Sequence, residues 1–174
     1  GAVLEWHTGT DTFIRPSLGS WMTYGLGSEN QDLPGYITIC QALSQGGANN
    51  FGSAFLPAAF QGTPLGSGGV AASEALIPFI RGKNPRHLQQ LELEMLQKMA
   101  ATQRQQSGPD PQGAARLASF ELALRMQNEA PLAQDLASES AATHQLYGLN
   151  DPDTEDFGRQ CLMARRFAER GVRF

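Results

Sequence analysis

The segment Tyr36–Cys40 (YITIC) decides the fold prediction, because it is the clearest strand in the chain. It is rich in β-branched residues, has only the length of a strand, and follows the turn-forming pair Pro34 and Gly35. Helical patterns come next, and Val172 opens a second strand-like stretch after the helix stop at Gly171. The order of strand, helices and strand is typical of an α/β fold, here rich in helix and with few strands.

Three helical patterns follow the strand. Leucine and methionine recur at spacings of three and four over Leu88–Met99, which predicts an amphipathic helix over 86–106 with this apolar row in the core. A second run over 117–128 ends before Pro131 and forms a hairpin with the first. A third helix over 152–170 has acidic residues in its first turn and arginines in its last, an arrangement that favours the helix dipole.

The remaining segments are predicted to be mostly loop. Residues 1–15 have no clear period and are expected to form a loop with room for one short strand. Pro16 opens a short helix that Gly25 and Gly27 end. Residues 44–73 are dense in Gly, Asn, Ser and Pro but carry four large apolar side chains, so we expect a long ordered loop that lines a pocket or a partner surface.

Composition excludes several classes of function. With 41% hydrophobic and 17% charged residues the chain can bury one core, which argues against intrinsic disorder. The net charge of −4 is small and of the wrong sign to attract polyanions, so nucleic acid and anionic membrane surfaces are not expected partners. No apolar run approaches the roughly 20 residues of a membrane span. Cys40 and Cys161 lack the spacing of a zinc or redox pair and are expected to be two separate buried thiols.

The two ends indicate an internal section of a longer polypeptide. Gly1 rather than Met opens the chain, the first methionine is Met22, and Gly171–Phe174 has the pattern of a helix stop followed by the opening of a strand. We therefore expect the remainder of its own domain to be a partner of this section.

His7, Thr8, Arg15 and Ser17 are the candidate residues of a substrate pocket. They put an imidazole, hydroxyls and a guanidinium at or before the N-terminus of a helix, where free N–H groups and the helix dipole bind anions. The alternative is a capped helix with a surface arginine, since small polar clusters are common by chance.

Sequence motifs of known catalytic chemistry are absent. The chain has no complete dinucleotide fingerprint, no phosphate-binding loop and no G-x-S-x-G nucleophile elbow. His87 and His144 have no partner at the spacing of metal ligands, and the acidic residues of Asp151–Asp156 are explained by a helix start. No metal site is therefore predicted within this section, and no catalytic residue can be named.

Longer stretches carry a resemblance that covers nearly the whole chain in order. The chain resembles a bacterial family known as domain of unknown function fifteen-oh-one. The matching stretches are Arg15–Trp21 (RPSLGSW), Tyr24–Gln31 (YGLGSENQ), Leu33–Gly35 (LPG), Phe55–Pro57 (FLP), Phe60–Gly62 (FQG), Glu121–Ala123 (ELA), Arg125–Gln127 (RMQ), Glu129–Pro131 (EAP), Phe157–Leu162 (FGRQCL), Ala164–Arg166 (ARR) and Glu169–Phe174 (ERGVRF).

The resemblance implies an alkaline phosphatase or sulfatase-like α/β/α sandwich, in which metal ions and a nucleophile lie at the strand ends. Residues 1–174 would be an internal section of one such domain, with a long loop over about 44–73 and a helical section over about 86–170. This section would fall between the two groups of metal ligands. Divalent metal ions are then expected in the full-length protein, but none is expected to bind this section alone.

The implied activity is metal-dependent hydrolysis of sulfate or phosphate esters, with a small molecule or a polysaccharide ester as substrate. This section would be its central, non-catalytic part and inactive alone. Kinship also implies export by the twin-arginine route and an extracytoplasmic location. One alternative is a binding or scaffold module that retains the fold without chemistry, and another is a self-contained, mostly helical interaction domain ending at Phe174.

Overall fold

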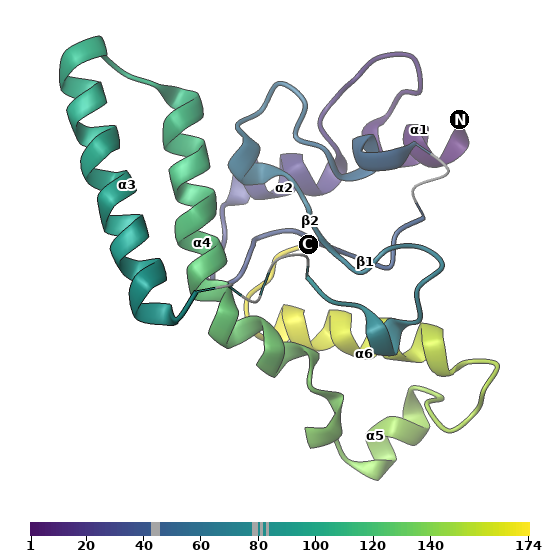
Figure 1. The fold of residues 1–174 in the computed structure, drawn as a ribbon. Helices are drawn as coiled ribbons and strands as arrows, with labels where there is room; N and C mark the ends of the chain where they lie inside the picture. The colour runs from purple at the N-terminus through teal and green to yellow at the C-terminus, as the bar shows by residue number, and fades with distance from the viewer. Residues whose placement is uncertain (43–45, 78–79, 81, 83) are drawn as a thin grey trace.

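A computed structural model describes residues 1–42, 46–77, 80, 82 and 84–174 (Figure 1). In that part of the chain the fold is mostly helical, with six α-helices and a two-stranded parallel sheet. The helices and strands are α1 (Ala2–Thr8), α2 (Leu18–Leu26), β1 (Ile37–Ile39), β2 (Thr63–Leu65), α3 (Arg86–Ser107), α4 (Pro111–Gln134), α5 (Ala141–Leu146) and α6 (Glu155–Glu169). Short 3-10 helices are η1 (Gly47–Phe51), η2 (Ala58–Phe60), η3 (Ala72–Glu74) and η4 (Leu136–Ser138).

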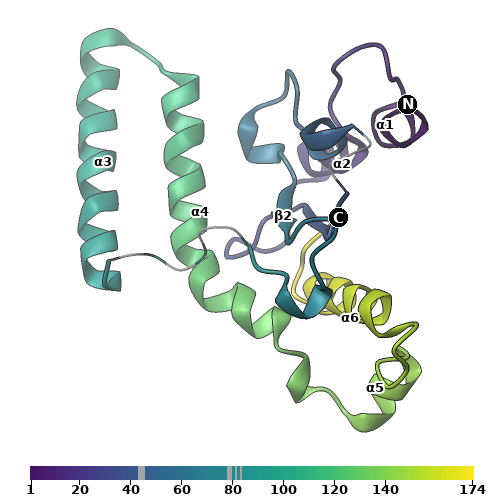
Figure 2. The ribbon, with the colours of Figure 1, turned by 45° about the vertical axis from the view of Figure 1, so that its right-hand side comes forward.

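The small sheet lies between α2 on one side and α6 on the other (Figures 1 and 2). β1 forms where the β-branched segment predicted a strand, and it pairs in parallel with β2, Ile37 opposite Thr63 and Ile39 opposite Leu65. The α/β prediction is thus confirmed in a coarse form. β2 lies inside the segment predicted as a long loop, whose first residue, Ser44, is outside the described residues.

The last residues of the chain return to β1 without forming a regular strand. The Ile37 N–H donates to the Phe174 carbonyl at 2.9 Å, and the Phe174 N–H donates to the Gly35 carbonyl at 3.1 Å. Val172–Phe174 is not a regular strand, so the predicted strand opening at Val172 is found only in part: these two bonds are the pair that joins one residue to a parallel neighbour, and they involve Phe174 alone. The position beside β1 is nevertheless the one that a neighbouring strand would take.

The core forms where α6 packs on α4 and on the sheet. Leu162 and Phe167 of α6, Ala130 of α4 and Leu65 of β2 are among its most completely buried side chains. Each large apolar side chain buried in this way contributes about 1.5–3 kcal/mol. Gly158 lets α6 approach the segment after α5 closely, since a Cβ there would clash with the Tyr147 carbonyl oxygen.

The third predicted helix is confirmed as α6, although it begins three residues later than expected. The Asp151 carbonyl accepts from the N–H groups of Thr154 and Glu155, so the acidic stretch forms a turn that leads into the helix. Glu155 and Asp156 remain in the first turn, where their charge favours the helix dipole.

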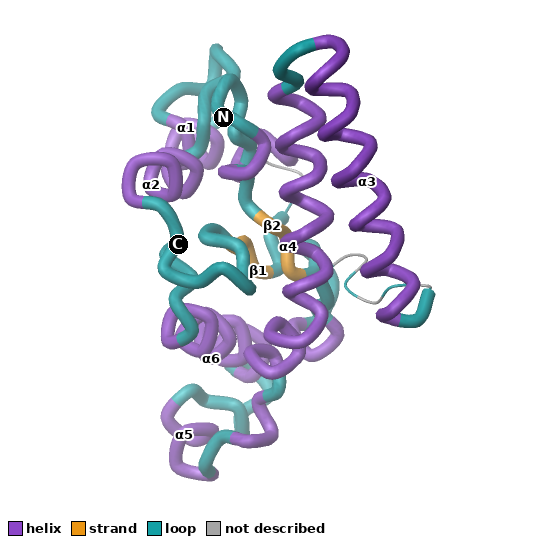
Figure 3. Tube along the Cα trace, turned by 90° about the vertical axis from the view of Figure 1, so that its left-hand side faces the viewer, coloured by secondary structure: helices purple, strands orange, loops and turns teal. Residues whose placement is uncertain are grey.

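A hairpin of α3 and α4 is confirmed, but the place predicted for the apolar row of α3 is wrong. No residue of α3 is buried, and the side chains of Leu91, Met95 and Met99 are 57–64% exposed. The half-buried residues Leu93 and Ala100 lie on another face of the helix. Figure 3 shows the physical reason: α4 stands between α3 and the rest of the molecule, so α3 has one helix to pack on and its other faces meet solvent.

Two further predictions of local structure are corrected. Residues 1–15 contain α1 rather than a strand, and Gly9, with φ of 77°, ends that helix in the left-handed conformation that glycine accepts readily. Pro131 does not end the second helix of the hairpin, because α4 continues through it to Gln134. Ala130 and Ala133 are fully buried on either side of that proline, so packing of the helix end offsets the missing backbone hydrogen bond.

A buried guanidinium closes the end of α4. Arg166 of α6 donates from Nε to the Ala133 carbonyl and from Nη2 to the Leu132 carbonyl, each at 2.9 Å. These are carbonyls of the last helical turn, which lack partners within the helix. Arg166 and Arg165 also pair with Glu139, the latter at 2.8 Å. The cluster ties α4, α6 and the segment after η4 together.

Candidate functional site

A cleft of about 820 Å³ lies along α4, on the side of the helix that faces the loop before β1. Its walls come from α4, from the first turns of α3, from the loop before β1 and from the segment around η2 and β2. The lining residues are Ser28, Asn30, Gln31, Leu33, Pro34, Gly35, Ala58, Ala59, Gln61, Thr63, Ile77, Ile80, Gly82, Gln89, Glu92, Leu93, Leu96, Ala118, Ser119, Phe120, Leu122, Ala123, Leu124, Arg125, Met126 and Gln127.

The cleft combines an apolar floor with polar walls, in which uncharged groups outnumber the charged side chains of Glu92 and Arg125. Leu33 and Met126 belong to the hydrophobic core and form part of the floor, so the site rests on a packed element. Amides are half of the polar side chains in the lining, and they both donate and accept hydrogen bonds. The Gln127 amide donates to Oε1 of Gln89 at 2.7 Å, which links α4 to α3 within the lining.

Arg125 is the cationic residue of the described lining. Its Nε donates to the Gln31 carbonyl at 2.8 Å and lies 3.7 Å from Oδ1 of Asp32. Neither terminal nitrogen of this guanidinium makes a hydrogen bond to a described residue. The side chain, 43% exposed, is therefore held at one nitrogen and presents the other two to the cleft or to solvent.

The structure places the four predicted pocket residues outside this cleft. His7 and Thr8 lie on α1, where the Thr8 hydroxyl donates to the Leu4 carbonyl at 2.8 Å. The Arg15 guanidinium lies 5.9 Å from the centre of the Phe13 ring. Ser17 is fully buried before α2. Within the described residues no interaction joins the α1 pair to Arg15 or Ser17, and a pocket role for these four stays a prediction.

Ser17 belongs to a buried polar network at the start of β1. Its N–H donates to the Gly52 carbonyl at 3.0 Å, and its Oγ lies 2.9 Å from Oγ of Ser20, which itself donates to the same carbonyl. Burial raises the pKa of the Tyr36 hydroxyl above its usual range, while a hydrogen bond with Ser17 partly opposes that rise. The phenol therefore stays neutral, and the network holds α2 against β1 and the η1 segment.

The sequence analysis did not single out Arg125, the cationic residue of the described part of the cleft lining. Its neighbours follow a helical period, and nothing in a single sequence shows that the loop containing Gln31 crosses this face of the helix. One part of the site was predicted from the sequence: the loop over 44–73 was expected to line a pocket or a partner surface, and its residues Ala58, Gln61 and Thr63 line the cleft. That prediction came from the Gly, Asn, Ser and Pro content of the loop together with its four large apolar side chains.

The ends of the two strands hold a half-buried thiol. Cys40 follows β1 with φ of 48°, and its N–H donates to the Leu65 carbonyl at 2.8 Å. Burial, and then the negative charge of Asp156, raise the pKa of this thiol above its usual range, which disfavours the nucleophilic thiolate. Cys161 is also free and half-buried, so the prediction of two separate thiols is confirmed while that of full burial is wrong.

Among the residues that the structure describes, no group of three or more His, Cys, Asp and Glu side chains is arranged to hold a metal ion. None of the helices in that part of the chain is long and apolar enough to cross a membrane.

No curated protein and no solved structure matches this chain. One family profile does match, over residues 1–174. The chain belongs to the family described as protein of unknown function (DUF1501).

Proposed function

We propose that this chain is the central, substrate-holding section of a metal-dependent hydrolase of sulfate or phosphate esters. In this proposal residues 1–174 are an internal section of an alkaline phosphatase or sulfatase-like α/β/α sandwich, and the nucleophile and metal ligands come from other parts of that domain. The observation that carries the proposal is the guanidinium of Arg125, anchored to the Gln31 carbonyl at the wall of an 820 Å³ cleft.

The chemistry of a guanidinium fits the substrate class. Arginine carries a permanent charge and presents parallel N–H groups that match two oxygens of a sulfate or phosphate group. Holding Nε on a carbonyl fixes the plane of the guanidinium, so less side-chain freedom is lost when the terminal nitrogens take up an oxyanion. The apolar floor at Leu33 and Met126 would receive the uncharged part of the ester.

The parallel arrangement of β1 and β2 supports the proposal that this chain is an internal section of an α/β/α sandwich. Parallel strands with helices on both sides are the unit from which larger α/β sheets are built, and a two-stranded pair gains stability when further strands extend it. Divalent metal ions, if bound by the flanking parts of the domain, would supply Lewis-acid activation of the ester. The role of this section is to bind and orient the ester group and its alcohol.

Steady-state kinetics of the full-length gene product test the proposal. With p-nitrophenyl sulfate and p-nitrophenyl phosphate as substrates, we expect Arg125→Ala to raise KM by about tenfold with little change in kcat, the equivalent of one charged hydrogen-bonded contact. Arg116→Ala, which removes a guanidinium from the same helix outside the cleft, is the matched control. The proposal fails if neither ester is hydrolysed, or if Arg125→Ala leaves KM unchanged.

A non-enzymatic binding or scaffold module is the second candidate, and the exposed apolar row of α3 favours it. Side chains such as Leu91, Met95 and Met99 stand in solvent at helical spacing, which is typical of a helix that packs on a partner. Reading the gene on both sides of this section separates the candidates. Clusters of Asp and His on both sides support the hydrolase, whereas flanks without them support the scaffold module.

A further inference from the structure

Four aromatic rings form a surface cluster beside the cleft. They are Trp21 and Tyr24 of α2, Phe60 of η2 and Phe55 from the preceding loop, here called the aromatic cluster. Trp21 meets Tyr24 and Phe55 with ring centres 6.1 and 5.8 Å apart, and Tyr24 meets Phe60 at 5.2 Å. All three pairs are edge-to-face, with interplanar angles of 69–89°.

The rings are fixed but remain open to solvent. Trp21 is 46% exposed, Tyr24 52% and Phe55 68%. Edge-to-face contacts are worth about 0.5–1.5 kcal/mol each beyond simple burial, so they hold the rings in defined orientations. A set of large, oriented and exposed rings is unusual on the surface of a soluble protein and marks a place where a ligand removes apolar area from water.

The aromatic cluster is continuous with the cleft through η2. This short helix contacts both α2 and α4, and Phe60 of the cluster lies between Ala59 and Gln61 of the cleft lining. A ligand that covers the rings can therefore continue into the cleft without leaving the protein surface. An extended polymer meets this requirement, whereas a small molecule would occupy one part alone.

The chemistry of the combined surface points to a polysaccharide. We propose that the aromatic cluster binds sugar rings of the polymer whose ester group enters the cleft. The C–H faces of a pyranose ring stack on aromatic faces, while its hydroxyls exchange hydrogen bonds with amides such as Gln61 and Asn30. The four cluster residues carry no charge, which suits sugar rings better than a charged peptide. This inference rests on the proposed function, because it names the substrate class of the same site.

Affinity gel electrophoresis of the full-length protein tests the inference. The probes are dextran sulfate and unmodified dextran, which is uncharged, each cast into a native gel at increasing concentration. We expect both to retard the protein, and we expect Trp21→Ala and Phe55→Ala to weaken binding of both by about tenfold, the size of the loss when a stacked ring is removed from an aromatic platform. Trp21→Phe, which keeps a ring, should restore most of the affinity.

Two controls keep the outcomes distinct. Phe13→Ala removes a ring that is 65% exposed but outside the cluster, and it should leave retardation unchanged. Arg125→Ala should weaken binding of the sulfated probe alone, because unmodified dextran carries no oxyanion. A variant that has lost its fold is recognised by its thermal unfolding midpoint, and Phe55→Ala, at a highly exposed position, then stands in for Trp21→Ala.

The possible results separate the two proposals. Retardation that depends on the aromatic cluster, in a protein without ester hydrolysis, supports this inference and overturns the proposed hydrolase. Ester hydrolysis without retardation by either probe overturns this inference and leaves the hydrolase in place. If the wild type is instead a dimer that Trp21→Ala converts to a monomer, the rings form an interface between copies and the polysaccharide inference is wrong.

Discussion

At the scale of single residues, the charged cluster around Glu139 shows how the free-energy cost of burying the Arg166 guanidinium is offset. Arg166 donates hydrogen bonds to the Ala133 and Leu132 carbonyls and to the Glu139 carboxylate, so its guanidinium is hydrogen-bonded and its charge is neutralised. Burying a charge is costly unless both conditions are met. The hydrogen bonds from Arg166 and then from Arg165 hold the pKa of the Glu139 carboxyl below its usual range.

This lowered pKa predicts a pH-dependent contribution to stability. The folded state favours the carboxylate of Glu139, so its contribution is fully present above the unfolded pKa of about 4.3 and is lost as the pH falls through the lower folded pKa. Urea unfolding between pH 7 and pH 3 should show wild type more stable than Glu139→Gln at pH 7, with the difference shrinking below about pH 4.

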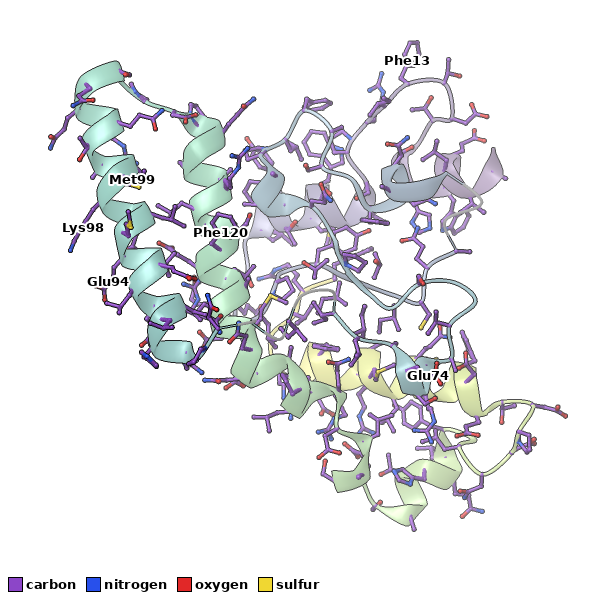
Figure 4. The ribbon with its side chains drawn as sticks, viewed as in Figure 1. Phe13, Glu74, Glu94, Lys98, Met99 and Phe120 are labelled. Carbon is purple, nitrogen blue, oxygen red and sulfur yellow. The ribbon has the colours of Figure 1, made fainter. Side chains whose placement is uncertain are left out.

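Glu94 provides the control for that measurement. It lies on α3 and its side chain points away from α4, as does that of Lys98 (Figure 4). Glu94→Gln should leave both the stability and its pH profile close to wild type. Parallel profiles for wild type and Glu139→Gln across the whole range would contradict the role assigned to the cluster.

At the scale of elements, α3 and α6 show why an amphipathic pattern does not by itself locate the core. Both helices carry apolar residues at helical spacing, and the sequence predicts that the apolar row of α3 lies in the core. α6 has the sheet on one side and α4 on another, and its Leu162, Met163 and Phe167 are almost completely buried. Among the described helices and strands, α3 packs mainly on α4, and none of its residues is buried.

Substitutions on the hairpin should reflect this difference between its helices. Met95→Gln on α3 should change the free energy of unfolding by less than about 0.5 kcal/mol, because the side chain is 64% exposed. Met126→Ala on α4 should cost about 2–4 kcal/mol, because that side chain is 5% exposed and its removal leaves a cavity. Chemical denaturation of the two variants under one condition makes the comparison, and a large loss in Met95→Gln would place the α3 row in a packed interface.

The same elements show how far the sequence could predict the molecule. β1, the hairpin and α6 follow from local patterns, and all three are found. β2 was hidden because its three residues include Pro64 and lie among glycines, so that only pairing with β1 makes them a strand. Arg125 could not be recognised for a similar reason, since the contact with Gln31 joins residues 94 positions apart. The sequence alone does not show which distant residues, such as Arg125 and Gln31, come together in the folded chain.

At the scale of the whole molecule, three distant segments meet at the end of the chain. The Phe174 ring lies edge-to-face against the Tyr36 ring, with centres 5.2 Å apart. A Cβ on Gly19 of α2 would lie 2.6 Å from Phe174 and 2.5 Å from Tyr36, so the absence of a side chain there lets all three segments approach. The final residue thereby connects α2 with the start of the sheet.

Removing the terminal ring should therefore destabilise the fold. We expect Phe174→Ala to lower the free energy of unfolding by about 1–2 kcal/mol, less than for a fully buried ring because Phe174 is 43% exposed. Guanidinium unfolding followed by far-ultraviolet circular dichroism measures the change. Phe157→Ala, which removes a 72% exposed ring from α6, should stay within about 0.5 kcal/mol of wild type. Equal effects of the two substitutions would contradict this role for the end of the chain.

The hairpin has a consequence for engineering the protein. Its tip, at Ser107–Pro109, stands at the far end of two helices from the core, between the C-terminus of α3 and the Asp110 cap of α4 (Figure 1). Exposed tips with little buried backbone are the positions where chains best accept inserted residues. A fluorescent label or an epitope inserted at this tip would allow the protein to be detected, and it would leave the cleft and the aromatic cluster uncovered.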